Sequence, residues 1–237
     1  QADAGREQYS DMRSVQNLEA IINEGLRVAL LEETPDQSLE VLLQHLGKAL
    51  NGERTYIFER NGFGGDDNTY EWVADGVEAE KENLQNVPPE VCASWYQNFR
   101  IGRHIVIESL EEIRETDPLQ YENLKRQNIH SLVVVPLYNG KKLIGFYGVD
   151  NPPVKSLEYA SNMLQTAAYF IVSSLKRRNL VRELQKRSYN VLHALSVDYL
   201  DIYQVNLDTG ECEIYRSSEQ MSMDWAVGYQ AAMEKYI

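Results

Sequence analysis

The side chains that most often carry catalysis or hold a metal are few in this sequence, and they stand apart. The histidines are His45, His104, His130 and His193. None of them has a second histidine, a cysteine or a carboxylate at the spacing of a metal site. Nucleophile motifs, phosphate-binding loops and dinucleotide-binding motifs are also missing from the sequence. We therefore predict no catalytic residue and no metal site. The sequence carries no flavin or haem signature, and any cofactor remains unknown.

A group of aromatic residues with polar tips could instead bind a small molecule. The candidates for ligand binding are Tyr70, Trp72, Trp95, Tyr96, Phe99, His104 and Tyr121. Tyr70 and Trp72 share one face of a predicted strand, and the next three follow Pro89 on a predicted helix. Ligand pockets are apolar and aromatic with a few polar groups, which these residues supply. Plain core packing is the favoured explanation of the aromatic residues, as a structural role is for His104, and the pocket stays open as the alternative.

Composition and charge exclude some classes of partner. The 237 residues are 43% hydrophobic and 25% charged, with a net charge of −13, so a sizeable core is expected. This acidity argues against binding to nucleic acid or to an anionic membrane. No apolar run approaches the roughly 20 residues that span a bilayer, and no signal peptide opens the chain. The first residue is Gln1 rather than Met, so we expect a fragment of a longer protein.

The two cysteines point to a reducing compartment. Cys92 and Cys212 lie far apart and form neither a CxxC motif nor a disulfide framework. We therefore predict a cytoplasmic protein with no membrane insertion. Cys92 follows Pro89 on a predicted helix, and free cysteines are commonly buried, so we expect it to be a buried helix residue.

A hairpin at residues 129–153 is the strongest structural signal. Two apolar runs, 132–137 and 143–149, flank a connection that contains Asn139-Gly140, and glycine tolerates the positive φ of a tight turn. Both runs are too continuously apolar to leave one face in water. They are therefore predicted to be central strands that are covered on both sides.

The remaining elements follow from hydrophobic periodicity. Helices are predicted over 15–30, from Pro35 with Thr34 as N-cap, after Pro89, and over 109–127 in two pieces broken at Pro118. Strands are predicted at 55–60, 69–74 and 104–107, and a second hairpin pairs 202–207 with 211–216. The segment 61–68 has turn chemistry.

One long helix is predicted from residue 156 to about residue 195. Leu157, Leu164 and Ile171 fall seven residues apart, and the apolar stripe slips at Lys176-Arg177-Arg178 before it restarts at Val181. A helix of about 40 residues is longer than a domain of this size needs. Its first part should therefore cover the sheet, and its second part should leave the domain. Lys176-Arg177-Arg178 is interpreted as a solvated stretch where core contacts end.

These elements give an α+β class, with an antiparallel sheet and helices on its faces. Residues 131–153, SLVVVPLYNGKKLIGFYGVDNPP, resemble the GAF domain, in which a strand ending in Pro precedes a turn and an L-I-G-x-x-x-x-D strand. Here Pro136, Gly145 and Asp150 occupy three of those positions. The resemblance covers about 39–176 and implies a small-molecule sensor module of a bacterial signalling protein. It implies a ligand pocket between the sheet and the helices of the middle segment.

A second resemblance concerns the C-terminal part. Residues 194–219, ALSVDYLDIYQVNLDTGECEIYRSSE, look like the opening of a PAS domain after a signalling helix. We expect an N-terminal signalling and dimerisation helix at 1–33, a GAF-like sensor at 34–178, a connecting helix at 179–195 and a truncated PAS-like start at 196–237. By analogy of domain order, the missing output would be a GGDEF diguanylate cyclase in cyclic di-GMP signalling, or else a histidine kinase.

The motifs by which related signalling domains catalyse a reaction or bind a known ligand are incomplete or absent in this sequence. Gly64-Gly65-Asp66-Asp67 resembles part of a GGDEF motif, but Asp67-Asn68 stands where Glu-Phe is needed, so we interpret it as a connecting loop. Ala93 follows Cys92 where bilin-binding GAF domains have histidine, which does not favour bilin attachment. The cyclic-nucleotide signature is not recognisable. No enzyme activity is therefore expected of this fragment.

Two functions of different classes fit these features. In the first, a small molecule of unknown identity fills the middle pocket and the change passes through the exit helix to the output domain. In the second, the module binds no ligand and acts as a dimerisation spacer. Its N- and C-terminal helices would then pair in a homodimer and set the geometry of downstream domains.

Overall fold

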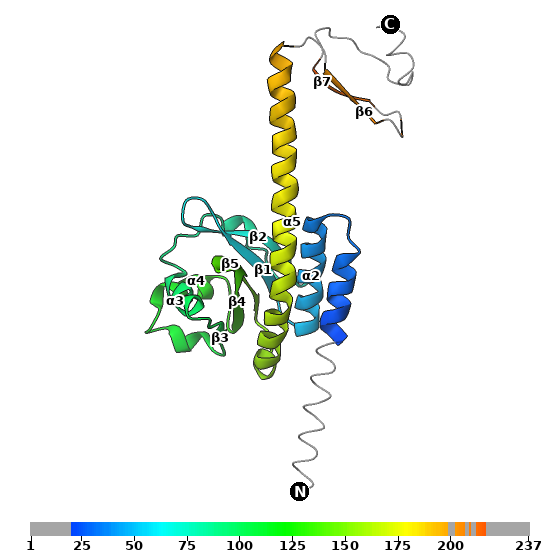
Figure 1. The fold of residues 1–237 in the computed structure, drawn as a ribbon. Helices are drawn as coiled ribbons and strands as arrows, with labels where there is room; N and C mark the ends of the chain where they lie inside the picture. The colour runs from blue at the N-terminus through cyan, green and yellow to red at the C-terminus, as the bar shows by residue number, and fades with distance from the viewer. Residues whose placement is uncertain (1–19, 199–201, 207–208, 210–211, 217–237) are drawn as a thin grey trace. The chain divides into compact units, whose positions relative to one another are not determined.

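The computed structural model of the chain describes residues 20–198, 202–206, 209 and 212–216. The chain divides into two units, with the boundary between Arg178 and Asn179. The first unit contains a five-stranded antiparallel sheet in the order β2-β1-β5-β4-β3 (Figure 1). Its strands are β1 (Arg54–Arg60), β2 (Asp66–Val73), β3 (Ile105–Ile107), β4 (Leu132–Asn139) and β5 (Lys142–Asp150).

Helices cover both faces of this sheet. They are α2 (Pro35–Leu50), α3 (Ala93–Arg100), α4 (Pro118–Arg126) and the first part of α5 (Leu157–Asp198), and residues 20–30 are also helical. Short 3₁₀ turns stand at η1 (Lys81–Asn83), η2 (Leu110–Ile113) and η3 (Val154–Ser156). In Figure 1, α2 and α5 lie on one face of the sheet, and α3 and α4 lie on the other. The predicted α+β class is confirmed.

The predicted hairpin forms the centre of the sheet. Strands β4 and β5 pair antiparallel around a two-residue turn, in which Gly140 has a φ of 63°. Side chains of both strands are buried on both faces of the sheet. At Gly145 the backbones of β5 and β1 approach closely, since a Cβ atom there would lie 2.0 Å from the carbonyl oxygen of Phe58. Glycine is the residue that such an approach requires.

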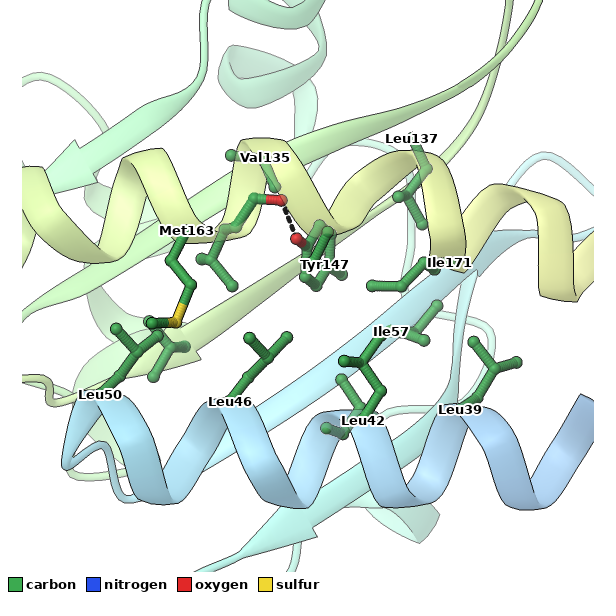
Figure 2. Close-up of a cluster of buried hydrophobic side chains, with 14 of the residues drawn as sticks. Leu39, Leu42, Leu46, Leu50, Ile57, Val135, Leu137, Tyr147, Met163 and Ile171 are labelled. Atoms are coloured by element: carbon green, nitrogen blue, oxygen red, sulfur yellow. Dashed lines mark hydrogen bonds between the residues drawn. The ribbon is translucent and has the colours of Figure 1, made fainter. Parts of the chain in front are cut away.

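Aliphatic side chains fill the space between the sheet, α2 and α5, as Figure 2 shows. From α2 come Leu39, Leu42, Leu46 and Leu50, which recur on one face of the helix. Tyr147 of β5 is fully buried among them, and its hydroxyl donates a hydrogen bond to the carbonyl oxygen of Leu164 in α5 (Figure 2). This face is therefore a closed core whose tyrosine hydroxyl is satisfied.

The start of α2 follows the predicted capping chemistry. The Thr34 side chain accepts a hydrogen bond from the Gln37 backbone N–H, and the Gln37 side chain accepts from the Thr34 backbone N–H. These two bonds form a capping box, with Pro35 as the first helical residue. At the other end, Asn51 closes the helix with a φ of 51°. The predicted beginning of this helix is confirmed.

Strand β2 begins earlier than predicted. Asp66 and Asp67 belong to the strand, so the prediction that Gly64-Gly65-Asp66-Asp67 is entirely a loop is wrong. Asp66 is fully buried, and its carboxylate accepts a hydrogen bond of 2.5 Å from the Tyr96 hydroxyl. The sequence does not indicate this start of the strand, because Gly and Asp are typical turn residues and aspartate is rarely buried.

Helix α5 runs from Leu157 to Asp198, as the long periodic pattern predicted. Its first part is buried against the core through Leu157, Leu164 and Ile171, whereas residues 179–191 are exposed. The interpretation of Lys176-Arg177-Arg178 as solvated is wrong for Arg178, which is only 5% exposed. A buried arginine needs a partner, and the helical period places Arg178 on the same face as Ile171 and Leu175.

In the second unit, β6 (Ile202–Val205) and β7 (Cys212–Arg216) pair as an antiparallel hairpin. The strand pairing is as predicted, but the predicted turn falls partly outside the described residues, as do residues 1–19 of the predicted N-terminal helix. Within the described parts of the chain, none of the helices combines the length and apolarity that crossing a bilayer would take.

Candidate functional site

A small cavity lies between the sheet and helices α3 and α4. Its volume is about 30 Å³. Its polar lining residues are Arg54, Tyr56, Glu71, Gln120, Asn123, Gln127 and Asp150. Its apolar lining residues are Phe58, Leu84, Val87, Cys92, Trp95, Leu124, Ile129 and Phe146. The cavity thus has both charged and apolar walls, the composition expected of a small-molecule site.

Arg54 holds the charged side of the cavity together. Its Nη1 donates to Gln127 Oε1 and to Asp150 Oδ2, both at 3.4 Å, and its Nη2 donates to the Glu78 carbonyl oxygen at 3.0 Å. Its Nε lies 3.7 Å from Glu71 Oε1. The side chain is only 5% exposed, so one buried guanidinium faces two buried carboxylates.

Glu71 reaches the cavity because of a β-bulge. Ile57 of β1 pairs with Tyr70, whereas Phe58 pairs with Asn68, so Thr69 is an extra residue in β2. This irregularity lets Asn68 and Glu71 lie on the same side, where the Asn68 amide donates to Glu71 Oε1 at 3.2 Å. The other oxygen of Glu71 accepts from the backbone N–H groups of Glu80 and Lys81, at 2.9 and 3.0 Å.

Asp150 is the most perturbed carboxyl group at the cavity. It is 2% exposed at the end of β5, and burial raises its pKa to about 7, against the opposing influence of Arg54 and Tyr56. The carboxylates of Glu71 and Glu53 add to this rise in pKa. Burial and the charge of Asp150 also raise the pKa of Tyr56 well above its usual value. Asp150 is therefore poised to exchange a proton near neutral pH.

Three polar atoms at this cavity make no hydrogen bond within the described parts of the chain. They are Arg54 Nε, Gln120 Oε1 and Asp150 Oδ1. Buried polar groups in folded proteins are almost always hydrogen-bonded, to protein or to ordered water. Because Gln120 and Asp150 are at most 2% exposed, these atoms are available to hydrogen-bond a water or a small molecule in the cavity.

Four of the seven predicted ligand-binding residues lie on this side of the sheet. Trp95 lines the cavity itself, while Tyr96, Phe99 and Tyr121 belong to the same hydrophobic cluster. The Tyr121 hydroxyl donates to Glu111 Oε1 at 2.9 Å. The hydroxyls of Tyr96 and Tyr121 are thus bound within the protein, and Trp95 alone of the seven borders the cavity.

The structure places the other three predicted residues elsewhere. Tyr70 is buried on the α2 and α5 face, and Trp72 packs against the same cluster. His104 is exposed beside an open groove next to Tyr138. Tyr70 and Trp72 share a face, as predicted, but it is the face opposite to Glu71 because side chains alternate along a strand.

The charged residues of the cavity were missed by the sequence reasoning. Arg54 and Glu71 were not singled out in the sequence, and Asp150 was named only as a position of the GAF-like motif. One signal was available, since Asp150 directly follows an apolar run that was predicted to be buried on both faces. A charge that continues such a run is a candidate for a buried functional group.

Arg178 was also missed, and it belongs to a separate network on the other face. Its guanidinium donates to both carboxylate oxygens of Glu59, at 2.8 and 2.7 Å, and to the Tyr70 hydroxyl at 3.0 Å. Burial would lower the pKa of Arg178, but the bonds to Glu59 and Tyr70 hold it above its ordinary value. This bidentate pair ties α5 to β1 at the last residue of the first unit.

Cys92 is buried, as predicted, with 4% of its surface exposed. Burial raises the pKa of its thiol to about 12. The thiol is therefore protonated at neutral pH and is a poor nucleophile. Among the described residues, His, Cys, Asp and Glu side chains form no group of three that could hold a metal ion.

The first unit thus places an antiparallel sheet between two helical layers, with a cavity under α3 and α4. The sequence profile of the GAF domain family matches residues 34–175, which is more than half of the chain. The chain therefore belongs to the GAF domain family.

One relative is the methanogenesis regulatory histidine kinase FilI of Methanothrix harundinacea (strain 6Ac), 30% identical over 170 residues. The match covers 64% of this chain and 18% of that kinase, so the chain corresponds to a small part of its relative.

Solved structures share the fold at low sequence identity. One is the far-red absorbing dark state of JSC1_58120g3 with bound biliverdin IXa, with a TM-score of 0.58 and 16% identity over 67% of this chain and 99% of that one. Another is the phytochrome photosensory core module of Stigmatella aurantiaca, with a TM-score of 0.55 and 9% identity over 75% of this chain and 41% of that one. These similarities support the fold alone.

Proposed function

We propose that this chain is a non-catalytic sensor module that binds a small molecule in the cavity under α3 and α4. The observation that carries the proposal is the set of buried polar atoms at that cavity that make no hydrogen bond within the described residues, Arg54 Nε, Gln120 Oε1 and Asp150 Oδ1. A ligand that bonded to these atoms would stabilise the conformation in which they face the cavity more than a conformation in which they do not. Such a difference in affinity is the condition for shifting a conformational equilibrium. β1 lines the cavity and is also bonded to α5 by Arg178, so it offers a route for the change.

The output of the whole protein is part of this proposal. The relative FilI is named a histidine kinase, which favours kinase control over the diguanylate cyclase that domain order suggested. A PAS-like domain after α5 stays a prediction, supported by the β6–β7 hairpin alone. A cytoplasmic location likewise remains a prediction.

A bilin is a poor candidate for the ligand here. JSC1_58120g3 holds biliverdin, but the cavity of this chain measures about 30 Å³, far below the ~300 Å³ or more of typical pockets for drug-sized ligands. The protonated, buried Cys92 thiol does not favour covalent attachment either.

The sensor proposal can be tested by thermal shift of the whole chain against a library of small polar metabolites. Ligand binding to the folded state raises the melting temperature by mass action. Val87→Phe, which fills the cavity, should abolish the shift. Leu46→Ala is the matched control, because it weakens the opposite core without touching the cavity, and it should keep the shift. If nothing in the library shifts the wild-type chain, the sensor proposal loses its support.

A second candidate, a ligand-free dimerisation module, is favoured by the exposed part of α5. Leu180, Leu184 and Val191 are each at least 57% exposed, and they follow one another at intervals of four and seven residues. Such a stripe is the pattern of a helix that pairs with a second copy. We propose a homodimer through this stripe, which is compatible with the sensor function.

Light scattering after size-exclusion chromatography tests this pairing. Leu184→Glu should convert a dimer into a monomer because it places a charge in the apolar seam. Gln185→Glu introduces the same charge one residue further along an exposed stretch and should leave the mass unchanged. A wild-type chain that runs as a monomer at high concentration would contradict the pairing.

A further inference from the structure

We propose that the cavity binds a short primary amine in its protonated form, with the ammonium group between Asp150 and Gln120. This inference rests on the proposed sensor function and names the chemical class of its ligand. It follows from three observations: the charge balance of the buried groups, the kind of polar atoms left without a partner, and the size and lining of the cavity.

The buried charges at the cavity do not balance. Glu71 and Asp150 are both carboxylates with at most 3% of their side chains exposed, and Arg54 is the cation that faces them. With both acids ionised, the cluster carries one uncompensated negative charge. Such a charge is costly in a buried site unless a proton or a bound cation neutralises it. The cluster thus lacks one positive charge.

The polar atoms without a hydrogen bond indicate which hydrogen-bonding groups a positively charged ligand should carry. Asp150 Oδ1 and Gln120 Oε1 are both acceptors, so a ligand that bonded to both would bring at least two N–H or O–H donors. An ammonium group has three donors and a positive charge, which matches both requirements. An anion would instead meet the carboxylates of Glu71 and Asp150, so Arg54 Nε alone would favour it.

The size and the lining limit the rest of the ligand. A single water needs at least about 10 Å³ of cavity volume, so the cavity of about 30 Å³ has room for two or three heavy atoms. Trp95, Phe58 and Phe146 offer an apolar wall to a short carbon chain, and aromatic faces also attract cations. Methylammonium and ethylammonium have this size and this pairing of a cation with an apolar end.

Binding should depend on pH because the amine and a proton compete for Asp150. The charged and titratable groups that face Asp150 are Arg54 and Tyr56 of β1, Glu71 of β2 and Glu53 just before β1. Gln120 of α4 and Gln127, the residue that follows α4, are neutral. With a pKa of about 7, Asp150 is mostly ionised at pH 8 and mostly protonated at pH 6. The affinity should therefore fall about tenfold from pH 8 to pH 6.

Isothermal titration of the whole chain with methylammonium and ethylammonium chloride tests the inference, with potassium chloride at equal ionic strength as the blank. We expect binding at pH 8, about tenfold weaker binding at pH 6, and loss of at least tenfold in affinity in Asp150→Asn. Asp75→Asn removes an exposed carboxylate and is the matched control, so it should bind like the wild type. Gln120→Met provides a second variant that removes an acceptor and no charge, and it should also weaken binding.

Other results would overturn the inference in distinguishable ways. Equal binding of tetramethylammonium, which has no N–H donor, would contradict hydrogen bonding to Asp150. Binding of acetate, lost in Arg54→Met, would show an anion site and leave the sensor function standing. If neither amine binds but another metabolite raises the melting temperature, the proposal of an amine ligand is refuted and the proposed sensor function is retained. No binding by any compound would refute both.

Discussion

The two faces of the sheet are built on different principles, although the same strands supply both. The face under α2 and α5 is mostly aliphatic, and its ion pair between Arg178 and Glu59 is bidentate. Its buried hydroxyls are also satisfied, as Tyr147 and Thr55 show by donating to the carbonyl oxygens of Leu164 and Leu43. The face under α3 and α4 buries Arg54 and two carboxylates. All five unpartnered buried side-chain atoms in the described parts of the chain belong to residues of this second face or its edge.

This difference separates stability from recognition. A closed aliphatic core maximises the burial of apolar surface and offers a ligand neither a cavity nor a free hydrogen-bonding group. A half-satisfied polar cluster costs stability unless something completes it, and such groups cluster at functional sites. The first face therefore holds the domain together, and the second face is the one that can respond to its surroundings.

The largest effect is expected when the only cation of the cavity cluster is removed. Arg54→Met leaves Glu71 and Asp150 buried without a counter-charge, which should cost about 3–5 kcal/mol of unfolding free energy at pH 8. Chemical denaturation at pH 8 and pH 5 measures this cost. It should be smaller at pH 5, where Asp150 is protonated. An equal cost at both pH values would contradict the charge argument.

A truncation on the opposite face should be nearly as costly and independent of pH. Leu46→Ala removes a fully buried side chain from the α2 and α5 core and should lower the unfolding free energy by about 2–4 kcal/mol through cavity formation. The same denaturation at the two pH values should give the same loss. A loss that varied with pH would mean that the two faces are not separate.

The titration of Asp150 sharpens the comparison further. A carboxyl group with a raised pKa binds its proton more tightly in the folded chain, so its contribution to stability is full below about pH 4 and is lost as pH rises through about 7. Asp150→Asn has no titrating group at this position, so its unfolding free energy should not fall in this way as the pH rises. The variant should gain roughly 1–3 kcal/mol relative to the wild type between pH 5 and pH 8. Parallel stability curves for the two chains would disprove the raised pKa.

The smallest effect is expected at the start of α2. Thr34→Ala removes the hydroxyl of the capping box and should cost about 1 kcal/mol, measured as a lower melting temperature. Thr34→Ser keeps the hydroxyl and should restore most of the loss. Neither variant should change amine binding, because Thr34 belongs to the helix on the closed face.

The sequence was sufficient for the fold because the fold depends on patterns of burial. The apolar runs of β4 and β5, the Thr34 cap and the 42-residue α5 all leave periodic or chemical signals. The bulge at Thr69 does not, since one extra residue in a strand changes no composition. That bulge decides which β2 side chains face the cavity.

The candidate site was less predictable for the same reason. Aromatic residues drew attention, but of those proposed only Trp95 borders the cavity. The residues that give the cavity its character, Arg54, Glu71 and Asp150, are charges whose burial depends on contacts between distant strands. Arg178 was interpreted as solvated because three consecutive basic residues usually are, although its partner Glu59 lies 119 positions away.

The tight approach at Gly145 has a mechanical consequence. Because the backbones of β5 and β1 approach closely there and the two strands pair over six residues each, we expect this pair to keep its register. The pair β1–β2 instead carries an extra residue and can adjust more easily. When a ligand binds in the cavity, we therefore expect β2 to shift relative to β1, while β1 and β5 keep their positions relative to each other.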